Sequence, residues 1–256
     1  TEYPMLKLAM LCFWHVVIIN TKIGGNMDRN LQQIYDASSE SLGVRHRVLR
    51  NTYWLLAISM IPTIFGAWLG VQLNFSFFTG SPLIGFMAFL AIAFGFFYAI
   101  EKTKNSGLGV AVLLGFTFFM GLMLSRLIGH ILGFSNGASL IMTAFGGTAT
   151  IFGVMATVAT VSKRDFSGLG KWLFAGVLVI LAAAVANIVL QLPALHLAIA
   201  LLVRAFLVAY ILFDVQQIIN GGETNYISAT LSIYMDVYNI FVNLLSLLGI
   251  FGGSRD

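Results

Sequence analysis

The sequence has few charged residues. Aspartate, glutamate, lysine and arginine make up 9% of the 256 residues, whereas hydrophobic residues make up 59%. A soluble domain typically has about 25% charged residues, so this chain does not have enough charge to cover a water-facing surface. The composition therefore excludes a soluble globular protein and predicts an integral membrane protein in a lipid bilayer.

Cysteine is equally scarce. The single cysteine, Cys12, excludes an intramolecular disulfide and any cysteine-rich metal site. No motif typical of phosphate, zinc or haem binding occurs, so no cofactor is predicted. The net charge of +4 does not indicate nucleic-acid binding, because basic residues in membrane proteins gather in the cytoplasmic loops.

Long apolar stretches are abundant instead. A helix needs roughly 20 apolar residues to cross the hydrocarbon core, and seven stretches after residue 50 qualify. They are 53–73, 82–100, 107–132, 138–161, 171–190, 195–219 and 227–250. The separators are short, so sequential helices are expected to be antiparallel neighbours. We predict an all-α fold with a seven-helix transmembrane domain over residues 51–256.

The N-terminal part reads differently. The apolar run from Met5 to Ile19 is broken by Lys7 and is too short for a confident span. Met27 then opens MDRNLQQ, which is typical of a natural start. We interpret residues 1–26 as a non-native or upstream extension, and residues 27–50 (Met27 to Arg50) as an N-terminal tail.

Lysine and arginine lie on alternate sides of the predicted spans. The tail and the loops after the second and fourth spans carry Arg29, Arg45, Arg47, Arg50, Lys102, Lys104, Lys163, Arg164 and Lys171. The alternate loops at 74–81, 133–137 and 191–194 carry no lysine or arginine. The positive-inside rule then places the tail in the cytoplasm. With seven spans, the C-terminus lies outside.

Five charged or titratable residues fall well inside the predicted spans: Arg126, His130, Arg204, Asp214 and Asp236. Placing such a group at the centre of a span costs roughly 2.5 to 3.5 kcal/mol, so a functional site is the default hypothesis. The alternative is that each residue only pairs to hold helices together, or extends to the membrane interface. We favour this alternative for Arg126 and His130, and also for His196 at a helix end.

The two aspartates favour a site. Asp214 lies six residues before Asn220, roughly 9 Å from the cytoplasmic end of its span, and Asp236 lies roughly 15 Å from the same face. On adjacent antiparallel spans the two carboxylates come within reach of each other. They would then share a proton, because two close carboxylates in a low dielectric do not both ionise cheaply. When deprotonated they would offer the hard oxygen ligands that Ca²⁺ prefers.

The last span carries a polar stripe around its aspartate. Helical spacing puts one set of side chains on one face: Ser232, Asp236, Asn239, Asn243 and Ser246. Such a stripe is expected to face the bundle interior or a watery cavity. On the preceding span, Gln217 extends the face of Asp214, and Arg204, roughly 15 Å away, is placed to bound an ion pathway externally. The structural alternative is interhelical hydrogen bonding, worth about 0.6 kcal/mol per contact.

These same residues carry a resemblance. YILFDVQQIINGGETNYISATLSIYMDVYNIFVNLLSLLG resembles the C-terminal signature of the Bax inhibitor-1 family, and AFGGTATIF, residues 144–152, is similar to the family's fourth-span motif. ANIVLQLPALHLAIA and GGETNYI resemble the bacterial YccA-like branch more narrowly. The resemblance covers residues 27–256.

The resemblance implies a seven-helix fold with the C-terminal helix at the centre of the bundle. It implies that Asp214 and Asp236 match the family's pH-sensing pair, which gates a calcium leak. Members of the YccA-like branch are inner-membrane substrates and modulators of the membrane-anchored AAA protease FtsH, engaged through the tail, here Met27 to Arg50. Two departures matter: Gly129-His130 replaces a Gly-Pro of the family, and only Lys102 or Lys104 is available as the basic residue of the family's latch.

Three functions follow. The first is a modulator of FtsH in membrane-protein quality control, which is not an enzyme. The alternative is a pH-gated calcium or cation leak through the aspartates. The remote alternative is an intramembrane aspartyl protease, which uses the same shared-proton chemistry. Those enzymes carry Gly-x-Gly-Asp at the second acid, whereas Asp236 lies in Ile-Tyr-Met-Asp.

Overall fold

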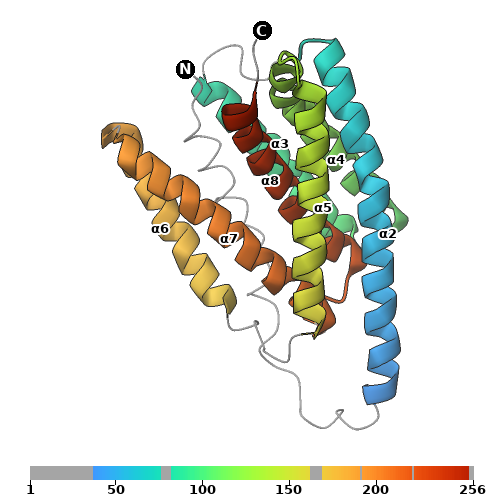
Figure 1. Ribbon diagram of the computed structural model, residues 1–256. Coiled ribbons are helices and arrows are strands. Elements are labelled where there is room, and N and C mark those ends of the chain that lie inside the picture. The colour runs from blue at the N-terminus through green and yellow to red at the C-terminus, as the bar shows by residue number, and fades with distance from the viewer. Residues whose placement is uncertain (1–36, 76–81, 162–168, 191, 221, 254–256) are drawn as a thin grey trace. The chain divides into compact units, whose positions relative to one another are not determined.

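The computed structural model describes residues 37–75, 82–161, 169–190, 192–220 and 222–253 (Figure 1). Every regular element in these ranges is a helix: α2 (Ala37–Gln72), α3 (Pro82–Thr103), α4 (Gly107–Leu132), α5 (Gly137–Val161), α6 (Leu169–Leu190), α7 (Pro193–Ile219) and α8 (Tyr226–Gly252). The predicted all-α class is confirmed for these ranges. Residues 1–36, which include the predicted extension and the start of the predicted tail, lie outside them.

Four helical segments in the described ranges are long and apolar enough to cross a membrane: Arg47–Gln72, Gly107–Leu132, Gly137–Val161 and Tyr226–Gly252. Their outer surfaces are apolar as well. On α2, for example, Trp54 is 68% exposed and Ile61 is 67% exposed. Extended apolar surface of this kind suits hydrocarbon rather than water. The chain is therefore a membrane protein, and the total of seven spans stays a prediction.

Part of the predicted tail is helical. Helix α2 begins at Ala37, so the second half of the stretch 27–50 is helical and runs directly into the first span. The polar sequence of residues 37–46 does not prevent this, because helical hydrogen bonds are local and a helix can continue beyond its apolar part.

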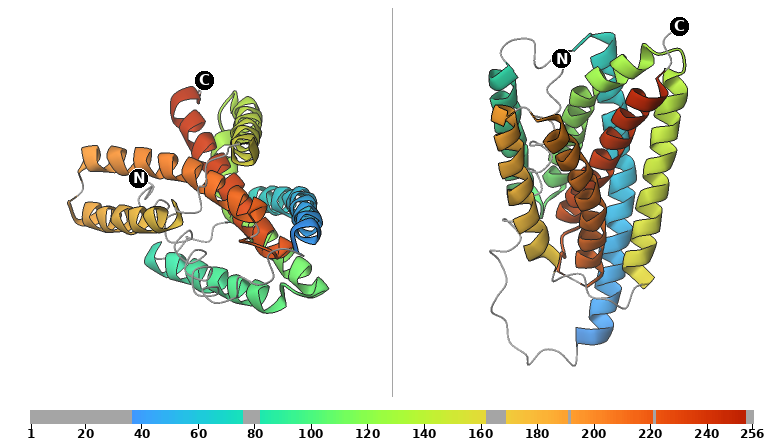
Figure 2. Two further views of the ribbon diagram at one scale, coloured as in Figure 1. Left: turned by 90° about the horizontal axis from the view of Figure 1, so that it is seen from below. Right: turned by 60° about the vertical axis from the view of Figure 1, so that its left-hand side comes forward.

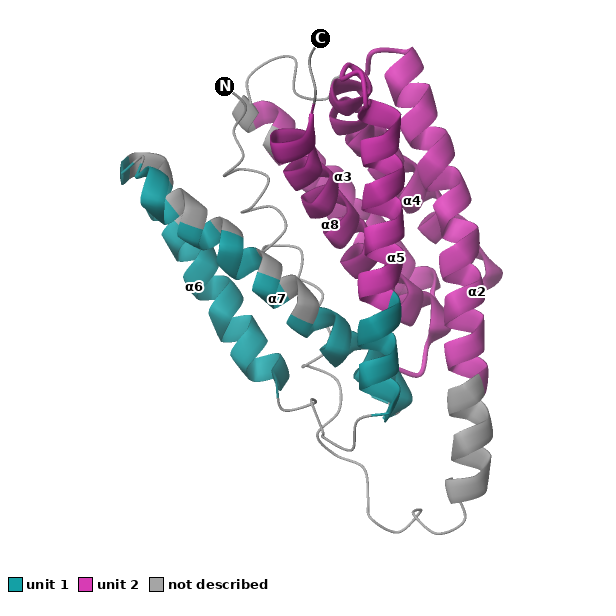
Figure 3. Cartoon of the chain, in the orientation of Figure 1, with its two compact units in different colours: residues 1–46, 153–222 teal, residues 47–152, 223–256 magenta. Residues whose placement is uncertain are grey.

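The chain divides into two compact units (Figure 3). Unit 1 comprises residues 1–46 and 153–222, and unit 2 comprises residues 47–152 and 223–256.

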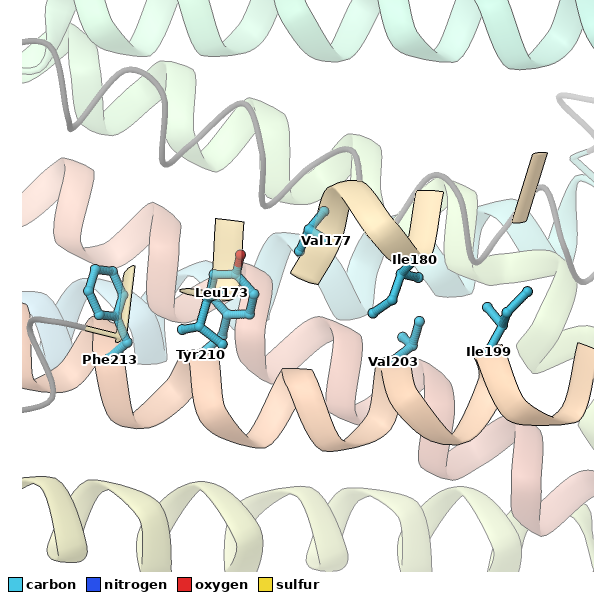
Figure 4. Packing of buried hydrophobic residues seen from close by; sticks show 7 residues of the cluster. All are labelled: Leu173, Val177, Ile180, Ile199, Val203, Tyr210 and Phe213. Carbon is cyan, nitrogen blue, oxygen red and sulfur yellow. The ribbon is translucent and has the colours of Figure 1, made fainter. Parts of the chain in front are cut away.

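Unit 1 is built around the antiparallel pair α6 and α7, which lie side by side in both views of Figure 2. Their packed faces carry large apolar side chains at helical spacing. Figure 4 shows this cluster, which consists of Leu173, Val177, Ile180, Ile199, Val203, Tyr210 and Phe213. The connection between the helices is fixed by a hydrogen bond of 2.9 Å from the backbone N–H of Leu192 to Asn187 Oδ1.

In unit 2, helices α2 and α4 approach each other backbone to backbone. A Cβ atom placed at Gly66 would overlap the carbonyl oxygen of Phe118, and one placed at Gly121 would overlap the carbonyl oxygen of Thr63. Glycine on both helices removes the side chains that would hold them apart. The close approach brings the Thr63 hydroxyl within 3.2 Å of the Thr117 carbonyl.

Helix α8 contacts each of the other four helices of unit 2. It packs against α3 and α4, its Tyr234 bonds to Thr63 of α2, and its Leu244 lies against Gly147 of α5. Its buried residues run from Ile227 to Leu245. Within unit 2, α8 is therefore an interior helix.

The start of α8 is held by Asn225. Its Oδ1 accepts hydrogen bonds from the backbone N–H groups of Ile227 (2.9 Å) and Ser228 (3.2 Å). Its Nδ2 donates to the carbonyl oxygen of Lys104 and to Asn105 Oδ1, each at 2.9 Å. One side chain thus caps the helix and ties it to the turn between α3 and α4.

Replacing Asn225 with alanine is expected to destabilise the protein by at least about 1 kcal/mol, the typical cost of removing an N-cap. The bonds to the α3–α4 turn would be lost as well. Thermal unfolding of the protein in detergent measures the effect. Asn220→Ala is the matched control, because Asn220 is an exposed residue after α7; equal melting temperatures for the two variants would contradict the role of Asn225.

Candidate functional site

Helix α8 carries two polar faces. Successive residues are about 100° apart around a helix, so Tyr234 and Asp236 project about 200° apart. We call Thr230, Tyr234 and Tyr238 the hydroxyl face. We call the opposite set the acidic face; it consists of Ser232, Asp236, Asn239, Asn243 and Ser246.

The hydroxyl face is hydrogen-bonded within unit 2. Tyr234 Oη and Thr63 Oγ1 share a hydrogen bond of 2.9 Å. Tyr238 Oη donates to the Met120 carbonyl at 3.3 Å. Thr230 Oγ1 donates to the carbonyl of Tyr226 one turn earlier at 2.6 Å. The first two bonds connect α8 to α2 and α4, and they give this face a structural role.

The acidic face is different. Asp236 and Asn239 are both fully buried, with 0% exposure, and Ser232 is 3% exposed. Neither Nδ2 nor Oδ1 of Asn239 has a hydrogen-bond partner among the described residues. Leaving a buried polar group unpaired costs about 1–3 kcal/mol. Hydrogen bonding between helices therefore does not account for Asn239.

The apolar residues one turn before and one turn after Asp236 are also buried. Ile233 is 0% exposed and Ile240 is 6% exposed. The sequence pattern alone would allow these residues to face lipid, but the packing of unit 2 covers them. Further along the acidic face, Asn243 Nδ2 donates to the backbone carbonyl of Asn239 at 2.8 Å, so this amide has a local partner.

The acidic face begins one turn earlier than the sequence pattern indicated. Ser228 lies four residues before Ser232 and so shares its face. Its hydroxyl oxygen is buried and has no partner among the described residues. Ser228 could have been found from the sequence, because it precedes Ser232 by the same four residues that separate Ser232 from Asp236.

Asp214 lies in unit 1, on α7. It is 5% exposed, and the neighbouring Gln216 is 4% exposed. Tyr210, 1% exposed, lies one turn earlier on the same face, whereas Gln217 is half-buried. The structure thus buries both predicted aspartates, each within its own unit, and their pairing stays a prediction. The side chains of Arg204 and His196 lie outside the described part of the chain.

The two other titratable residues predicted inside spans are at the surface. Arg126 and His130 are both exposed on α4, and the His130 ring lies edge-on to Phe134 with 5.3 Å between ring centroids. The structural alternative for both residues stays a prediction. Neither residue contributes to the acidic face.

The basic residues at the end of α3 have local partners. Lys104 forms an ion pair with Glu101, and the Lys102 ammonium lies over the Tyr98 ring, 5.2 Å from its centroid. Among the described residues, no group of three His, Cys, Asp or Glu side chains is placed to hold a metal ion. Asp214 and Asp236 as transient Ca²⁺ ligands therefore stay a proposal.

Comparison with known proteins supports the resemblance. The chain is 40% identical over 230 residues to the Modulator of FtsH protease YccA of Escherichia coli strain K12, covering 90% of this chain and 100% of that protein. It is 36% identical over 217 residues to an uncharacterized protein of Neisseria meningitidis serogroup A, covering 84% of this chain and 95% of the other. An uncharacterized membrane protein of Vibrio cholerae is 34% identical over 205 residues, covering 80% and 90%.

A family model provides independent support. The model described as Inhibitor of apoptosis-promoting Bax1 matches residues 45–253, a range that includes all of α3 to α8 and both buried aspartates. This chain therefore belongs to the Bax1-I family, the Inhibitor of apoptosis-promoting Bax1 proteins.

Proposed function

We propose that this chain is an inner-membrane protein that modulates, and is a substrate of, the protease FtsH. The observation that carries the proposal is its similarity to a protein named a modulator of FtsH protease, whose whole length the chain covers. The action is by interaction with the protease and not by an enzymatic reaction of its own.

The proposed topology has seven spans, with α8 at the centre of all of them and residues 51–256 as the transmembrane domain. The interior position of α8 in unit 2 supports it. The basic residues Arg47 and Arg50, exposed at the start of the first span, support a cytoplasmic tail. With seven spans, the C-terminus lies in the periplasm.

The proposed contact with FtsH is the segment Met27 to Arg50. Because α2 begins at Ala37, a deletion that preserves the helix should remove residues 27–36 only. Residues 1–26 are not expected to contribute.

The test is the half-life of a membrane substrate of FtsH in Escherichia coli cells that lack YccA. Producing this chain should lengthen the half-life, and the chain without residues 27–36 should not. A chain in which residues 27–36 are replaced by a scrambled sequence of the same composition is the control for length and charge. If the full chain is present in the membrane at normal levels and the half-life of the substrate is unchanged, the proposal is contradicted. If the chain without residues 27–36 lengthens the half-life as much as the full chain does, only the role of the tail is contradicted.

A second function is supported by a specific observation, the complete burial of Asp236 on the acidic face of a membrane-spanning helix. We propose that this face carries a pH-gated calcium or cation leak, with Asp214 as the second acid. Intramembrane carboxylates on a polar stripe are typical of ion and proton pathways. The two functions are compatible, since the leak uses α7 and α8 and the protease contact uses the tail.

Calcium flux into proteoliposomes tests the leak. In the wild type the flux should change with pH, and Asp236→Asn should flatten the response because the amide does not titrate. If the two aspartates share a proton, Asp214→Asn should have the same effect, and the double variant should add little. Thr230→Val, on the hydroxyl face, is the control. A wild-type pH profile in Asp236→Asn would exclude the pathway.

A further inference from the structure

Asn239 presents a buried amide that its own unit does not satisfy. The residue is 0% exposed, and both side-chain polar atoms lack a hydrogen-bond partner among the described residues. Its neighbour Asn243, which has the same functional group one turn later, donates to a backbone carbonyl instead. The unpaired amide is therefore specific to Asn239. Either a ligand satisfies it, or it carries a large energetic cost.

The two unpaired atoms define the chemistry of the ligand. Nδ2 is a donor and Oδ1 is an acceptor, so a cation would satisfy only Oδ1 and an anion only Nδ2. Water donates and accepts, and a buried water typically makes about three hydrogen bonds to groups that otherwise lack partners. Water is therefore the ligand that satisfies the whole amide.

Ser228 shows the same feature on the same line of the helix. It lies eleven residues before Asn239, which places the two side chains about 20° apart around the axis and roughly 16 Å apart along it. Its hydroxyl oxygen is buried and has no partner among the described residues. Ser232 and Asp236 lie between them on this face, and Asp236 is one turn from Asn239, close enough for a bound water to bridge them.

We propose that Asn239 is a binding site for a buried water, that Ser228 binds a second, and that these waters hydrate Asp236 along the acidic face of α8. This site does not depend on the protease interaction or on ion conduction. It gives Asp236 contact with water although the side chain is completely buried on an interior helix. Asn239 and Ser228 are positioning residues, since they act on Asp236 through water.

X-ray hydroxyl-radical labelling tests the proposal, because radicals formed from bound water oxidise the side chains next to it. Met235 is the reporter: it is 1% exposed and lies four residues before Asn239, on the neighbouring line of the helix. Met120 is the reference, because it is 2% exposed on α4. In the full-length wild-type protein in lipid nanodiscs, Met235 should be oxidised several times faster than Met120. Equal rates would overturn the proposal without the use of any variant.

Two matched pairs of variants locate the water. Asn239→Leu should lower the Met235 oxidation rate to that of Met120, whereas Asn243→Leu, which removes an amide that has a partner, should leave it unchanged. Ser228→Ala should slow Met235 oxidation, whereas Thr230→Val, which removes a hydroxyl bonded to Tyr226, should not. Asn239→Leu should also not raise the melting temperature, because an amide that is bonded to water has no unpaired polar group for the substitution to remove. A raised melting temperature with unchanged labelling would show that the amide is dry and would overturn the proposal.

Discussion

Gly121→Val is expected to abolish the folded protein. Even the first added carbon would overlap the carbonyl oxygen of Thr63, and it would lie 2.9 Å from the Thr63 carbonyl carbon and 3.0 Å from the Ala67 backbone nitrogen. All three atoms belong to the backbone of α2, so no side-chain rotation relieves the contact. The helices would have to separate, and the Thr63 bonds to Thr117 and Tyr234 would break with them.

The matched control is a glycine with open space around it. Gly95 lies in α3, and a Cβ added there meets nothing within 4 Å. Gly95→Ala should therefore be neutral or stabilising by about 0.4–1 kcal/mol, through the loss of freedom in the unfolded chain. Gly121→Ala should already lower the yield of monodisperse protein from detergent extraction. Equal yields and melting temperatures for the two alanine variants would contradict the close approach of α2 and α4.

Tyr234→Ala is expected to cost about 3–5 kcal/mol, the range for deleting a large buried aromatic side chain. The ring is 0% exposed and contacts Phe116 edge-on at 6.2 Å and Tyr238 at 6.1 Å between centroids. Lipid chains do not reach this position, so the deletion leaves a cavity in unit 2. Reversible unfolding in mixed micelles measures the loss.

Tyr234→Phe separates packing from hydrogen bonding. It keeps the ring and removes only the hydroxyl that bonds to Thr63, so a loss of about 1 kcal/mol is expected. A double-mutant cycle with Thr63→Val should show that the two changes are not additive. If Tyr234→Phe were as damaging as Tyr234→Ala, the aromatic contacts would not be the main contribution of this residue.

The fold class was predictable, because a helix that crosses the hydrocarbon core of a bilayer must be long and apolar, and the sequence shows such stretches directly. The described helices α3 to α8 follow the predicted stretches within a few residues. The start of α2 was not predictable from hydropathy, because residues 37–46 are polar and hydropathy does not report helix formation outside the membrane. The close approach of Gly66 on α2 to the backbone of α4 beside Gly121 was not predictable, because the sequence does not identify which helices meet at a glycine.

The candidate site was predictable in part. The cost of burying a carboxylate singled out Asp214 and Asp236, and both are buried. Helical spacing grouped Asn239 with Asp236, but it does not distinguish an amide with a partner from one without. That distinction separates Asn239 from Asn243 and depends on three-dimensional packing. The hydroxyl face was missed, because Tyr234 and Thr63 are 171 positions apart in the sequence.

The two proposed functions place different demands on the chain. Modulation of a protease needs a surface that the protease recognises, whereas Asp236 on the acidic face is completely buried. A variant of Asp236 should therefore change hydration or flux while leaving FtsH modulation intact. Removal of residues 27–36 should do the reverse.

The most direct test of the central claim uses purified components. FtsH, a membrane substrate and this chain are reconstituted together in proteoliposomes, and the rate of substrate degradation is measured with and without the chain. The proposed function predicts that the full chain slows degradation in a concentration-dependent way and that Asp236→Asn slows it equally. A degradation rate that is unchanged at every concentration of correctly folded chain would contradict it.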